Sequence, residues 1–223
     1  MNHTRIIIAD DHTLLADAIK NLLEPEFEVV GIFTDGRSLL EGAKQLTPDV
    51  VVLDIGMPVL NGLTAGARLK HLLPKVKLLY LTMNPDIELA AEAFRHGGSG
   101  YLLKTSAGSE LVRAIREVLR GGSYLTPAMR GNMIGSYVQN LKHRATPHKL
   151  TLRQKEVLQL LAEGRSMKEV AYELKITTRT VAFHKYTMME QLQVKTSAEL
   201  IQYALKNSIL SNHKVMDTSS PGY

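Results

Sequence analysis

Five short apolar runs, each separated from the next by a helix-length stretch, constrain the fold of this chain more than any other feature. The runs are rich in Val, Ile, Leu and Tyr and occupy residues 5–9, 28–33, 49–54, 76–82 and 100–104. Apolar runs of this length, with Gly and Pro between them, indicate strands. The first intervening stretch repeats apolar residues at helical spacing, at Leu14, Leu15, Ala18, Ile19, Leu22 and Leu23. Alternating strands and helices predict a parallel sheet with helices on both faces.

Polar side chains stand at the carboxyl ends of four of these runs. Asp10 and Asp11 follow the first run, Asp54 the third, Thr82 the fourth and Lys104 the fifth. In open parallel sheets, ligands collect at this edge, where the strand order reverses. Three clustered carboxylates need a cation, and oxygen ligands suit Mg²⁺.

The same edge carries the groups that a phosphoryl transfer needs. Thr82 offers a hydroxyl and Lys104 a mobile positive charge, which together can hold phosphoryl oxygens. Asp54 is then the nucleophile, and it forms an aspartyl phosphate. Taken singly, a strand-terminal Asp is more often a turn or cap residue, so the hypothesis depends on all five residues together.

Composition bounds the remaining possibilities. A chain of 223 residues accommodates two domains better than one, and it has no Cys that could form a disulfide or a thiolate metal site. No apolar stretch is long enough to span a membrane, so we expect a cytoplasmic protein. Residues 1–125 carry 13 basic against 15 acidic residues, and residues 126–223 carry 14 against 7. The basic half favours nucleic acid as a partner, although a solvated basic surface is an equally good interpretation of charge alone.

The first 122 residues resemble a response-regulator receiver domain of two-component signalling. The resemblance rests on motif residues that match in order and spacing: Asp10, Asp11, Asp54, Met57, Pro58, Asn61, Gly62, Thr82 and Lys104. It implies a flavodoxin-like, five-stranded parallel sheet and a phosphoryl group that Asp54 accepts from a sensor histidine kinase. It also implies that Asp11, Asp54 and the backbone carbonyl of Gly56 bind Mg²⁺ directly, with Asp10 nearby.

Three further positions matter within this resemblance. Tyr101 matches the aromatic residue whose inward turn accompanies the movement of Thr82 toward the phosphate. Thr105 follows Lys104 where many receivers have a proline after a cis bond. Met83 is bulky where many receivers carry a small residue, and it is expected to restrict access to the phosphoryl group.

The pattern changes after residue 122. Thr126 and Pro127 indicate the start of a helix that extends to about residue 141, followed by a tether. We therefore expect a linker over residues 123–149. Residues 150–210 contain four short helical patterns, with Thr151 and Ser166 as N-caps of the first two. A tight turn between the second and third predicts a helix-turn-helix. Residues 211–223 are polar, and we expect them to be disordered.

Residues 150–210 resemble the LuxR-type DNA-binding domain, and the whole chain resembles NarL/FixJ-type response regulators. The resemblance rests on Leu150, Thr151, Arg153, Glu156, Val157, Leu158, Ala162, Glu163, Gly164, Lys168, Glu169, Val170, Ala171, Thr180, Val181 and His184. It implies that the third helix enters the major groove of double-stranded DNA and that the active protein is a homodimer.

The candidate DNA contacts divide into two groups. Basic and hydroxyl side chains suit phosphates, and these are Lys168, Lys175, Thr177, Thr178, Arg179 and Lys185. Base reading is assigned to the exposed face of the third helix, at Ala182, Phe183 and Tyr186. Ala182 and Phe183 cannot make bidentate hydrogen bonds and could only pack on thymine methyls. Three alternatives remain: an operator rich in thymine, weak sequence readout, or a Phe183 that packs inside the protein.

We therefore predict a transcription factor, and not an enzyme, in which phosphorylation of Asp54 switches DNA binding or dimerisation. A phosphatase with an Asp54 nucleophile is one rival, but such sites usually have a second carboxylate two residues on, where this chain has Gly56. A DNA-binding regulator with a silent receiver, indifferent to phosphorylation, is the other.

Overall fold

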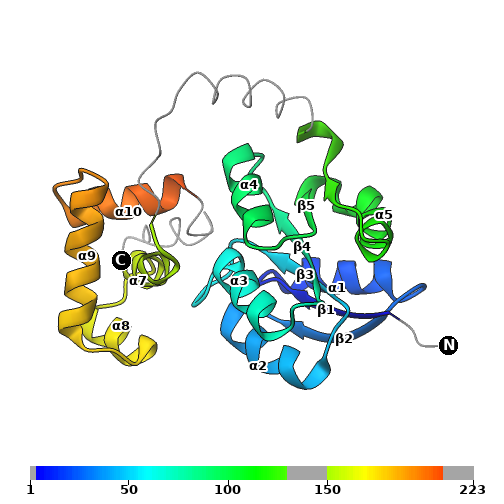
Figure 1. Cartoon of the computed structure of the whole chain (residues 1–223), viewed down its shortest axis with the longest axis horizontal. Helices are drawn as coiled ribbons and strands as arrows, with labels where there is room; N and C mark the ends of the chain where they lie inside the picture. The colour runs from blue at the N-terminus through cyan, green and yellow to red at the C-terminus, as the bar shows by residue number, and fades with distance from the viewer. Residues whose placement is uncertain (1–3, 130–149, 208–223) are drawn as a thin grey trace, which may run out of the picture. The chain divides into compact units, whose positions relative to one another are not determined.

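The computed structural model describes residues 4–129 and 150–207, which belong to two compact units of residues 1–145 and 146–223 (Figure 1). Of the linker predicted for residues 123–149, residues 130–149 lie outside the described residues, as does the predicted tail at residues 211–223. Pro127, Ala128 and Met129 are helical, as expected from the Thr126–Pro127 start signal. The Thr126 hydroxyl accepts a hydrogen bond from the Leu103 backbone at 3.0 Å.

The first unit contains the predicted parallel sheet. Its strands are β1 (Arg5–Ala9), β2 (Glu28–Phe33), β3 (Val50–Asp54), β4 (Lys77–Thr82), β5 (Gly100–Leu103) and β6 (Tyr124–Leu125). Their order is β2-β1-β3-β4-β5-β6, and every neighbouring pair is parallel. The five predicted strands are confirmed. The two-residue β6 was not predicted, because a strand this short has no periodicity to detect.

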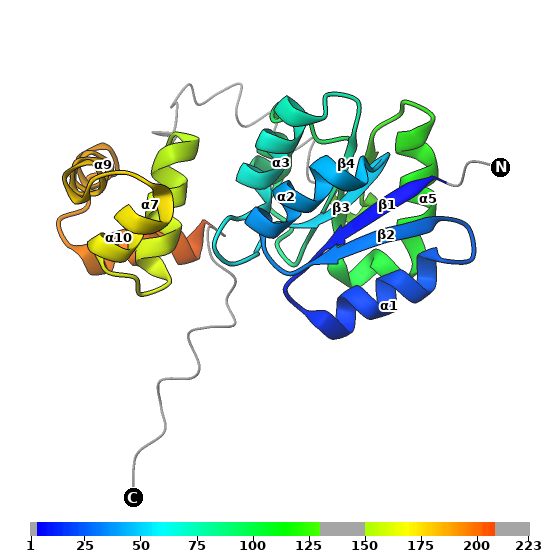
Figure 2. The same cartoon turned by 90° about the horizontal axis from the view of Figure 1, so that it is seen from below.

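Helices cover both faces of the sheet, as predicted. These are α1 (Thr13–Leu23), α2 (Gly36–Leu46), α3 (Gly62–Leu72), α4 (Ile87–Arg95) and α5 (Ala107–Leu119), and a 3-10 turn, η1, spans Lys104–Ser106. Figure 2 shows α1 and α5 on one face of the sheet and α2 and α3 on the other. Alternate strand residues point to the two faces, so the unit has two apolar clusters.

One predicted core face is only partly right. In α1 the buried residues are Ala16, Ile19 and Leu23, whereas the side chain of Leu14 is 86% exposed and Ala18 is also exposed. Leu14 lies in the first turn of the helix, two residues after His12, next to the polar edge of the sheet. The apolar spacing of the sequence could not distinguish this first turn from the buried turns that follow.

Strand register brings the predicted polar residues to one edge. Ala9 pairs with Leu53, so Asp10 and Asp54 follow them side by side at the point where the strand order reverses. Asp54 itself pairs with Leu81, which places Thr82 one residue further along β4.

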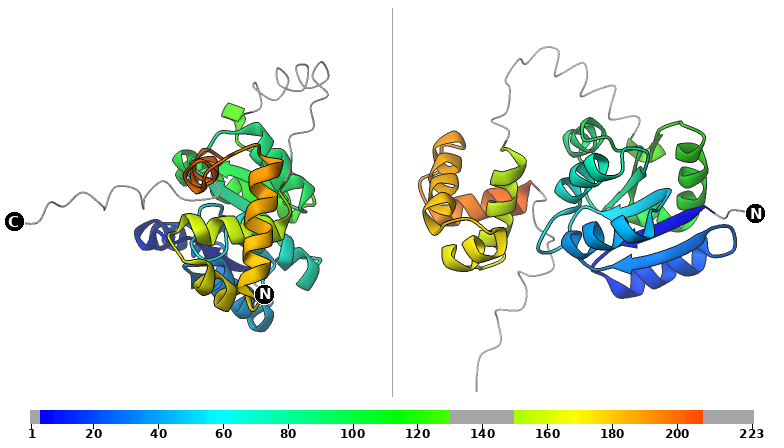
Figure 3. Two further views of the ribbon diagram at one scale, coloured as in Figure 1. Left: turned by 90° about the vertical axis from the view of Figure 1, so that its left-hand side faces the viewer. Right: turned by 60° about the horizontal axis from the view of Figure 1, so that its bottom comes forward.

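The second unit consists, in its described part, of α7 (Leu152–Ala162), α8 (Met167–Leu174), α9 (Thr178–Gln191) and α10 (Ser197–Lys206), coloured yellow-green to orange in Figure 3. Both predicted N-caps, Thr151 and Ser166, are confirmed, and each forms a capping box, with Gln154 and Glu169 respectively. Gly164 has a φ of +87°, a conformation that ends α7 and favours glycine. Between α8 and α9, Lys175 takes a left-handed conformation, and this gives the tight turn that a helix-turn-helix requires.

A small core joins these four helices. Val157, Leu158, Val170, Val181 and Leu200 are buried within it. Glu156 is 1% exposed, and its carboxylate lies 2.7 Å from Arg153, which also donates to the Leu174 backbone carbonyl. The ion pair lies within α7, and the Arg153–Leu174 hydrogen bond connects α7 to the end of α8. In the described residues, no helix is long and apolar enough to cross a membrane.

Two neighbouring buried tyrosines give a matched test of the receiver core. Tyr80 and Tyr101 pair across β4 and β5, and both are 0% exposed. The Tyr101 hydroxyl donates to the Asn84 carbonyl at 3.0 Å, whereas the Tyr80 hydroxyl has no hydrogen-bond partner among the described residues. It fits because residue 66 is glycine, where a Cβ would lie 2.0 Å from the Tyr80 oxygen.

We therefore expect opposite effects from the same substitution. Tyr80→Phe removes an unsatisfied buried hydroxyl and should leave stability unchanged or raise it by about 1 kcal/mol. Tyr101→Phe removes a satisfied hydroxyl and leaves a carbonyl with one partner fewer, at a cost of about 1 kcal/mol. Urea unfolding of both variants and the wild type would measure this. Equal destabilisation by both substitutions would contradict the hydrogen-bond assignment.

Candidate functional site

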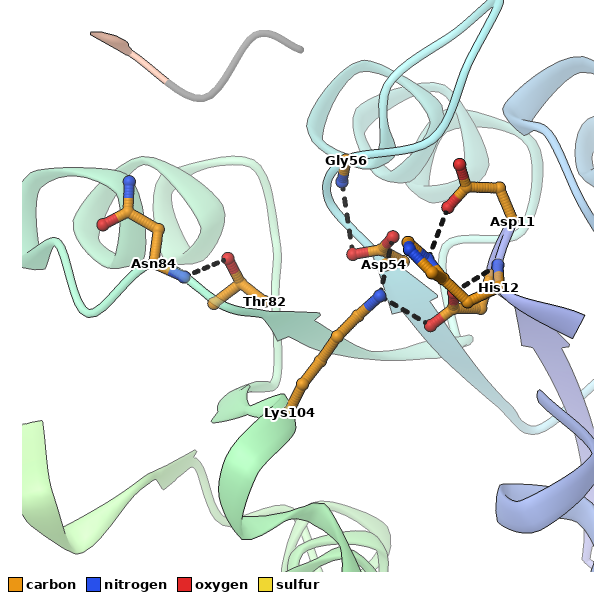
Figure 4. A network of polar contacts seen from close by, with 8 residues as sticks. Asp11, His12, Asp54, Gly56, Thr82, Asn84 and Lys104 are labelled. Atoms are coloured by element: carbon orange, nitrogen blue, oxygen red, sulfur yellow. Dashed lines mark hydrogen bonds and ion pairs between the residues drawn. The ribbon is translucent and has the colours of Figure 1, made fainter. Parts of the chain in front are cut away.

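The polar edge of the sheet forms a cluster of buried charges (Figure 4). Asp10 is 0% exposed and Asp54 3%, and Asp11 is half-buried beside them. Ligand atoms of Asp10, Asp11, His12 and Asp54 all lie within 4.8 Å of one another. The structure thus brings together the three carboxylates that the sequence placed at this edge.

Lys104 balances two of these carboxylates. Its Nζ lies 2.9 Å from an oxygen of Asp10 and 2.9 Å from an oxygen of Asp54, and its side chain is only 8% exposed. Burial lowers the pKa of Lys104, but the two carboxylates outweigh burial and hold the pKa above its ordinary value. The lysine is therefore a fixed positive charge beside Asp54.

Asp54 has an environment unlike that of a surface carboxylate. Burial raises its pKa from 3.8 to about 6, against the opposing effect of Lys104, and the charge of Asp10 raises it further. The Gly56 backbone N–H donates to the other Asp54 oxygen at 3.2 Å. The carboxylate thus has one oxygen on the lysine and one on the loop that follows the strand.

That loop is shaped by close packing and a strained turn. A Cβ at Gly62 would lie 2.0 Å from the Asp54 carbonyl oxygen, so only glycine lets α3 begin so near to β3. Asn61 caps α3 by accepting from the Thr64 N–H. Val59 has a φ of +65°, unusual for a β-branched residue, within a turn in which Leu60 N–H donates to the Pro58 carbonyl. Strain of this kind is often found beside functional groups.

Thr82 and Tyr101 are joined through Asn84. The Thr82 hydroxyl accepts from the Asn84 N–H at 3.0 Å, and Figure 4 shows it pointing toward that residue. The Asn84 carbonyl accepts from the Tyr101 hydroxyl at 3.0 Å. One residue therefore connects the hydroxyl at the end of β4 with the buried aromatic ring of β5. Met83, which lies between Thr82 and Asn84 in the sequence, is 68% exposed.

His12 belongs to the site and was not predicted. Its Nδ1 lies 3.0 Å from Asp11 and 3.2 Å from Asp10, and its backbone N–H donates to Asp10 at 2.9 Å. The backbone bond fixes the orientation of the Asp10 carboxylate. The available signal was its position directly after the acidic pair at the end of a strand.

The backbone at Lys104 has ordinary geometry, including the peptide bond to Thr105. The strand β5 ends at Leu103, one residue before the predicted end at residue 104, and Lys104 begins η1. The described chain has no cis peptide bond, so the Lys104–Thr105 bond is trans.

The candidate DNA contacts lie on α8, α9 and the turn between them. Lys168, Lys175, Thr177, Thr178, Arg179, Phe183 and Tyr186 are exposed, and Ala182 and Lys185 are half-buried. The Thr177 hydroxyl also caps α9, because it accepts from the Thr180 N–H. The idea that Phe183 packs inside the protein is wrong, since its side chain is 65% exposed. Val181 and Met188 occupy the buried face of α9 instead.

The two units carry complementary features. One holds a buried carboxylate paired with a fixed cation and surrounded by oxygen donors, and the other is a helix-turn-helix with a basic surface. This combination defines a receiver with a DNA-binding output. The family model of the response regulator receiver domain matches residues 6–116. The model of bacterial regulatory proteins of the luxR family matches residues 148–204.

Curated relatives match over nearly the whole chain. The oxygen regulatory protein NreC of Staphylococcus carnosus is 35% identical over 214 residues, covering 92% of this chain and 99% of the relative. The transcriptional regulatory protein DegU of Brevibacillus brevis is 33% identical over 223 residues, covering 92% of this chain and 94% of the relative. The chain therefore belongs to the NarL/FixJ-type response regulators, the two-component transcription regulators with a receiver and a LuxR-type DNA-binding domain.

Solved structures agree with this assignment. The RcsB response regulator of Salmonella typhimurium is similar with a TM-score of 0.66 and 26% identity, over 92% of this chain and 98% of the other. RcsB of Salmonella enterica serovar Typhimurium, bound to a promoter in the presence of the phosphomimetic BeF3-, gives a TM-score of 0.62 and 25% identity, over 92% and 99%.

The raised pKa of Asp54 gives a pH prediction for the metal-free protein. Between the unfolded value of 3.8 and the folded value of about 6, the folded chain binds the additional proton. The contribution of Asp54 to the free energy of unfolding should therefore fall as the pH rises from about 4 to about 6, by about 1.4 kcal/mol for each pH unit that separates the folded from the unfolded pKa. Asp54→Asn should remove this pH dependence.

Urea unfolding in the presence of a chelator, at several pH values in this window, would measure the effect. Asp17→Asn, which removes an exposed carboxylate of α1, is the matched control and should retain the wild-type pH dependence. Identical pH dependence in the wild type and Asp54→Asn would show that Asp54 titrates like a surface carboxylate.

Proposed function

We propose that Asp54 accepts a phosphoryl group from the phosphohistidine of a sensor histidine kinase, and that this controls DNA binding by the second unit. The observation that carries the proposal is the pairing of a buried carboxylate with Lys104 at 2.9 Å. An Asp54 oxygen attacks phosphorus, the phosphorus–nitrogen bond breaks, and the lysine neutralises the charge on the phosphoryl oxygens.

Mg²⁺ is the metal that the donor set suits. We assign Asp11, Asp54 and the Gly56 backbone carbonyl as direct ligands and Asp10 as a contact through water. Hard carboxylate and carbonyl oxygens fit this ion, which keeps several waters and binds phosphate oxygens. When bound, the ion neutralises the charge that develops on the transferred group. The Lys104 ammonium group can then move away from Asp54 while it keeps its contact with Asp10.

The switch acts through Thr82 and Tyr101. In the structure the Thr82 hydroxyl accepts from Asn84, which leaves its proton available to a phosphoryl oxygen. Movement of Thr82 toward the phosphoryl group pulls on the Asn84 peptide, to which the Tyr101 hydroxyl is bonded. The surface formed by α4 and Tyr101 is thereby biased between two states.

The output is a transcription regulator that binds double-stranded DNA. Phosphates are contacted by Lys168, Lys175, Arg179 and Lys185, with Thr177 and Thr178, and bases by Ala182, Phe183 and Tyr186. In α10, Leu200 and Ala204 belong to the core, whereas Ile201 and Leu205 are half-buried, so they can contribute to a homodimer contact. We assign residues 1–122 to the receiver, 123–149 to a linker whose first residues add β6 to the receiver sheet, 150–210 to DNA binding and 211–223 to a tail. The proposed protein is cytoplasmic and has no catalytic turnover.

Phosphorylation can be tested directly. The intact mass of the full chain should rise by about 80 Da after incubation with Mg²⁺ and acetyl phosphate, the mass of one phosphoryl group. Asp54→Ala should show no gain, and Asp17→Asn, the exposed control, should gain as the wild type does. Because Lys104 neutralises the acceptor, Lys104→Met should slow the gain at least tenfold.

A phosphatase would instead hydrolyse a phosphoester with turnover, which a phosphate-release assay with a phosphoester substrate would reveal. If neither acetyl phosphate nor phosphorylated sensor kinases of this class add mass at Asp54, while Mg²⁺ still binds, the receiver is silent. DNA affinity that is the same with and without the 80-Da adduct would favour the constitutive regulator.

Arg179 tests the DNA surface. It is exposed in the first turn of α9, and Arg179→Gln should weaken binding to all duplexes similarly and reduce the slope of log affinity against log salt by about 1. Lys206→Gln removes an equal charge from the exposed end of α10 and should change the slope less. Fluorescence anisotropy with labelled duplex over a salt series would measure both. Equal slopes in the wild type and Arg179→Gln would remove this residue from the interface.

A further inference from the structure

The outward face of α9 carries two exposed aromatic rings where a DNA-reading helix usually presents polar groups. Phe183 is 65% exposed and Tyr186 62%, and their spacing of three residues puts them on one face of the helix. The opposite face is fully used, because Val181 and Met188 are both 0% exposed. The rings therefore face outward because of how α9 packs, and rotation of the helix would expose its core residues.

Charge around the rings favours an anionic partner. Arg179, one turn before Phe183, is exposed, and Lys185 holds its Nζ 5.8 Å from the centre of the Tyr186 ring. Lys175 and the N-terminus of α9 lie at the same end of the helix. The only acidic residue of α9, Glu190, is in its last turn. The first three turns of α9 thus combine apolar rings with positive charge.

Duplex DNA offers a partner for both the positive charges and the apolar rings of α9. Its phosphates match the cations, and the major groove contains one apolar base substituent, the C5-methyl group of thymine. Ala182 and Phe183 have no hydrogen-bonding side-chain groups, and Tyr186 has a single hydroxyl, so none of them can form the bidentate bonds that select guanine or adenine. Because Phe183 is exposed, two of the three alternatives remain: contact with thymine methyl groups, or weak sequence readout. Two large rings on one face of α9 favour contact with thymine methyl groups.

We propose that Phe183 and Tyr186 form a methyl-reading pair that selects thymine at the base steps facing α9. This inference rests on the proposed DNA-binding function and specifies its base readout. The rings bury the thymine methyl groups, while Arg179 and Lys185 fix the helix on the phosphates. The selected operator should therefore be defined by thymine positions more than by guanine contacts.

The first experiment selects duplexes from a random-sequence library, with the full chain phosphorylated by acetyl phosphate in the presence of Mg²⁺. Selected duplexes should share thymines at fixed positions in each half-site. The same duplexes are then synthesised with deoxyuridine at one of these positions, which removes only the methyl group. Each replacement should lower affinity about fourfold, because burial of one CH₂-sized group contributes about 0.8 kcal/mol.

Variants assign the effect to the two rings. Phe183→Ala and Tyr186→Ala should bind the thymine duplex more weakly and lose most of the discrimination against deoxyuridine. Because both side chains are exposed, these variants should fold, which circular dichroism would verify. Tyr172→Ala is the matched control: Tyr172 is 87% exposed but lies on α8, and the variant should keep the full thymine preference. Tyr186→Phe should also keep it.

The outcomes separate this inference from the proposed function. Equal affinity for thymine and deoxyuridine duplexes, with salt-dependent binding retained, would overturn methyl reading and leave DNA binding in place. Unchanged discrimination in both alanine variants would overturn the assignment to these residues. Absence of binding to any duplex at low salt would contradict the proposed function itself. Sedimentation that changes in Phe183→Ala without DNA, or binding to anionic vesicles through the rings, would assign the face to another partner.

Discussion

The buried contact of Lys104 with two carboxylates is the interaction on which the receiver depends. Asp10 and Asp54 are almost fully buried beside each other, and each lies 2.9 Å from the same ammonium group. Without that cation, two desolvated like charges would meet at the reversal point of the sheet, where their ionised forms are strongly disfavoured. One positive charge cannot satisfy three carboxylates. Burial is the main cause of the raised pKa of Asp54, and the neighbouring charge of Asp10 adds to it. The excess of negative charge that remains at the site suits a divalent cation.

The sheet makes this arrangement possible by close packing around the end of β3. Gly62 lets α3 begin against the Asp54 carbonyl, and Gly36 similarly lets α2 approach the Leu60 carbonyl, where a Cβ would lie 2.3 Å away. In the loop between β3 and α3, Val59 adopts a positive φ. A rigid loop keeps the Gly56 N–H on one Asp54 oxygen while Lys104 holds the other. The orientation of the Asp54 carboxylate is thus set by the backbone path and by a single side-chain partner, Lys104.

Much of the fold and of the receiver site could be predicted from the sequence, because strand ends and apolar runs are local properties. The limits fall at particular residues. The helix α3 is buried on most of its sides, since Leu63, Ala65 and Leu69 are among its buried residues. It therefore lacks the one-sided apolar stripe that identifies a surface helix from sequence. Leu14 has helical spacing, but its exposure depends on where the first turn of α1 meets the sheet. His12 and Phe183 required tertiary structure: one joins the acidic pair only through folding, and the other faces outward because Val181 and Met188 fill the core.

In the proposed switch, the charge of a phosphoryl group on Asp54 acts over a short range. The Debye length at physiological salt is about 8 Å, so a phosphoryl group on Asp54 acts electrostatically only on its own surroundings. What the structure offers instead is a short mechanical connection. Asn84 uses its N–H for Thr82 and its carbonyl for Tyr101, so a displacement of Thr82 reaches the aromatic ring through a single peptide segment. Tyr101 is fully buried in a cluster that includes Leu89, Ala90 and Ala93 of α4. In the proposed switch, movement of its ring therefore requires repacking of α4, and this would convert a local change of charge into a change of surface. A switch of this kind needs no contact between the phosphoryl group and the output unit.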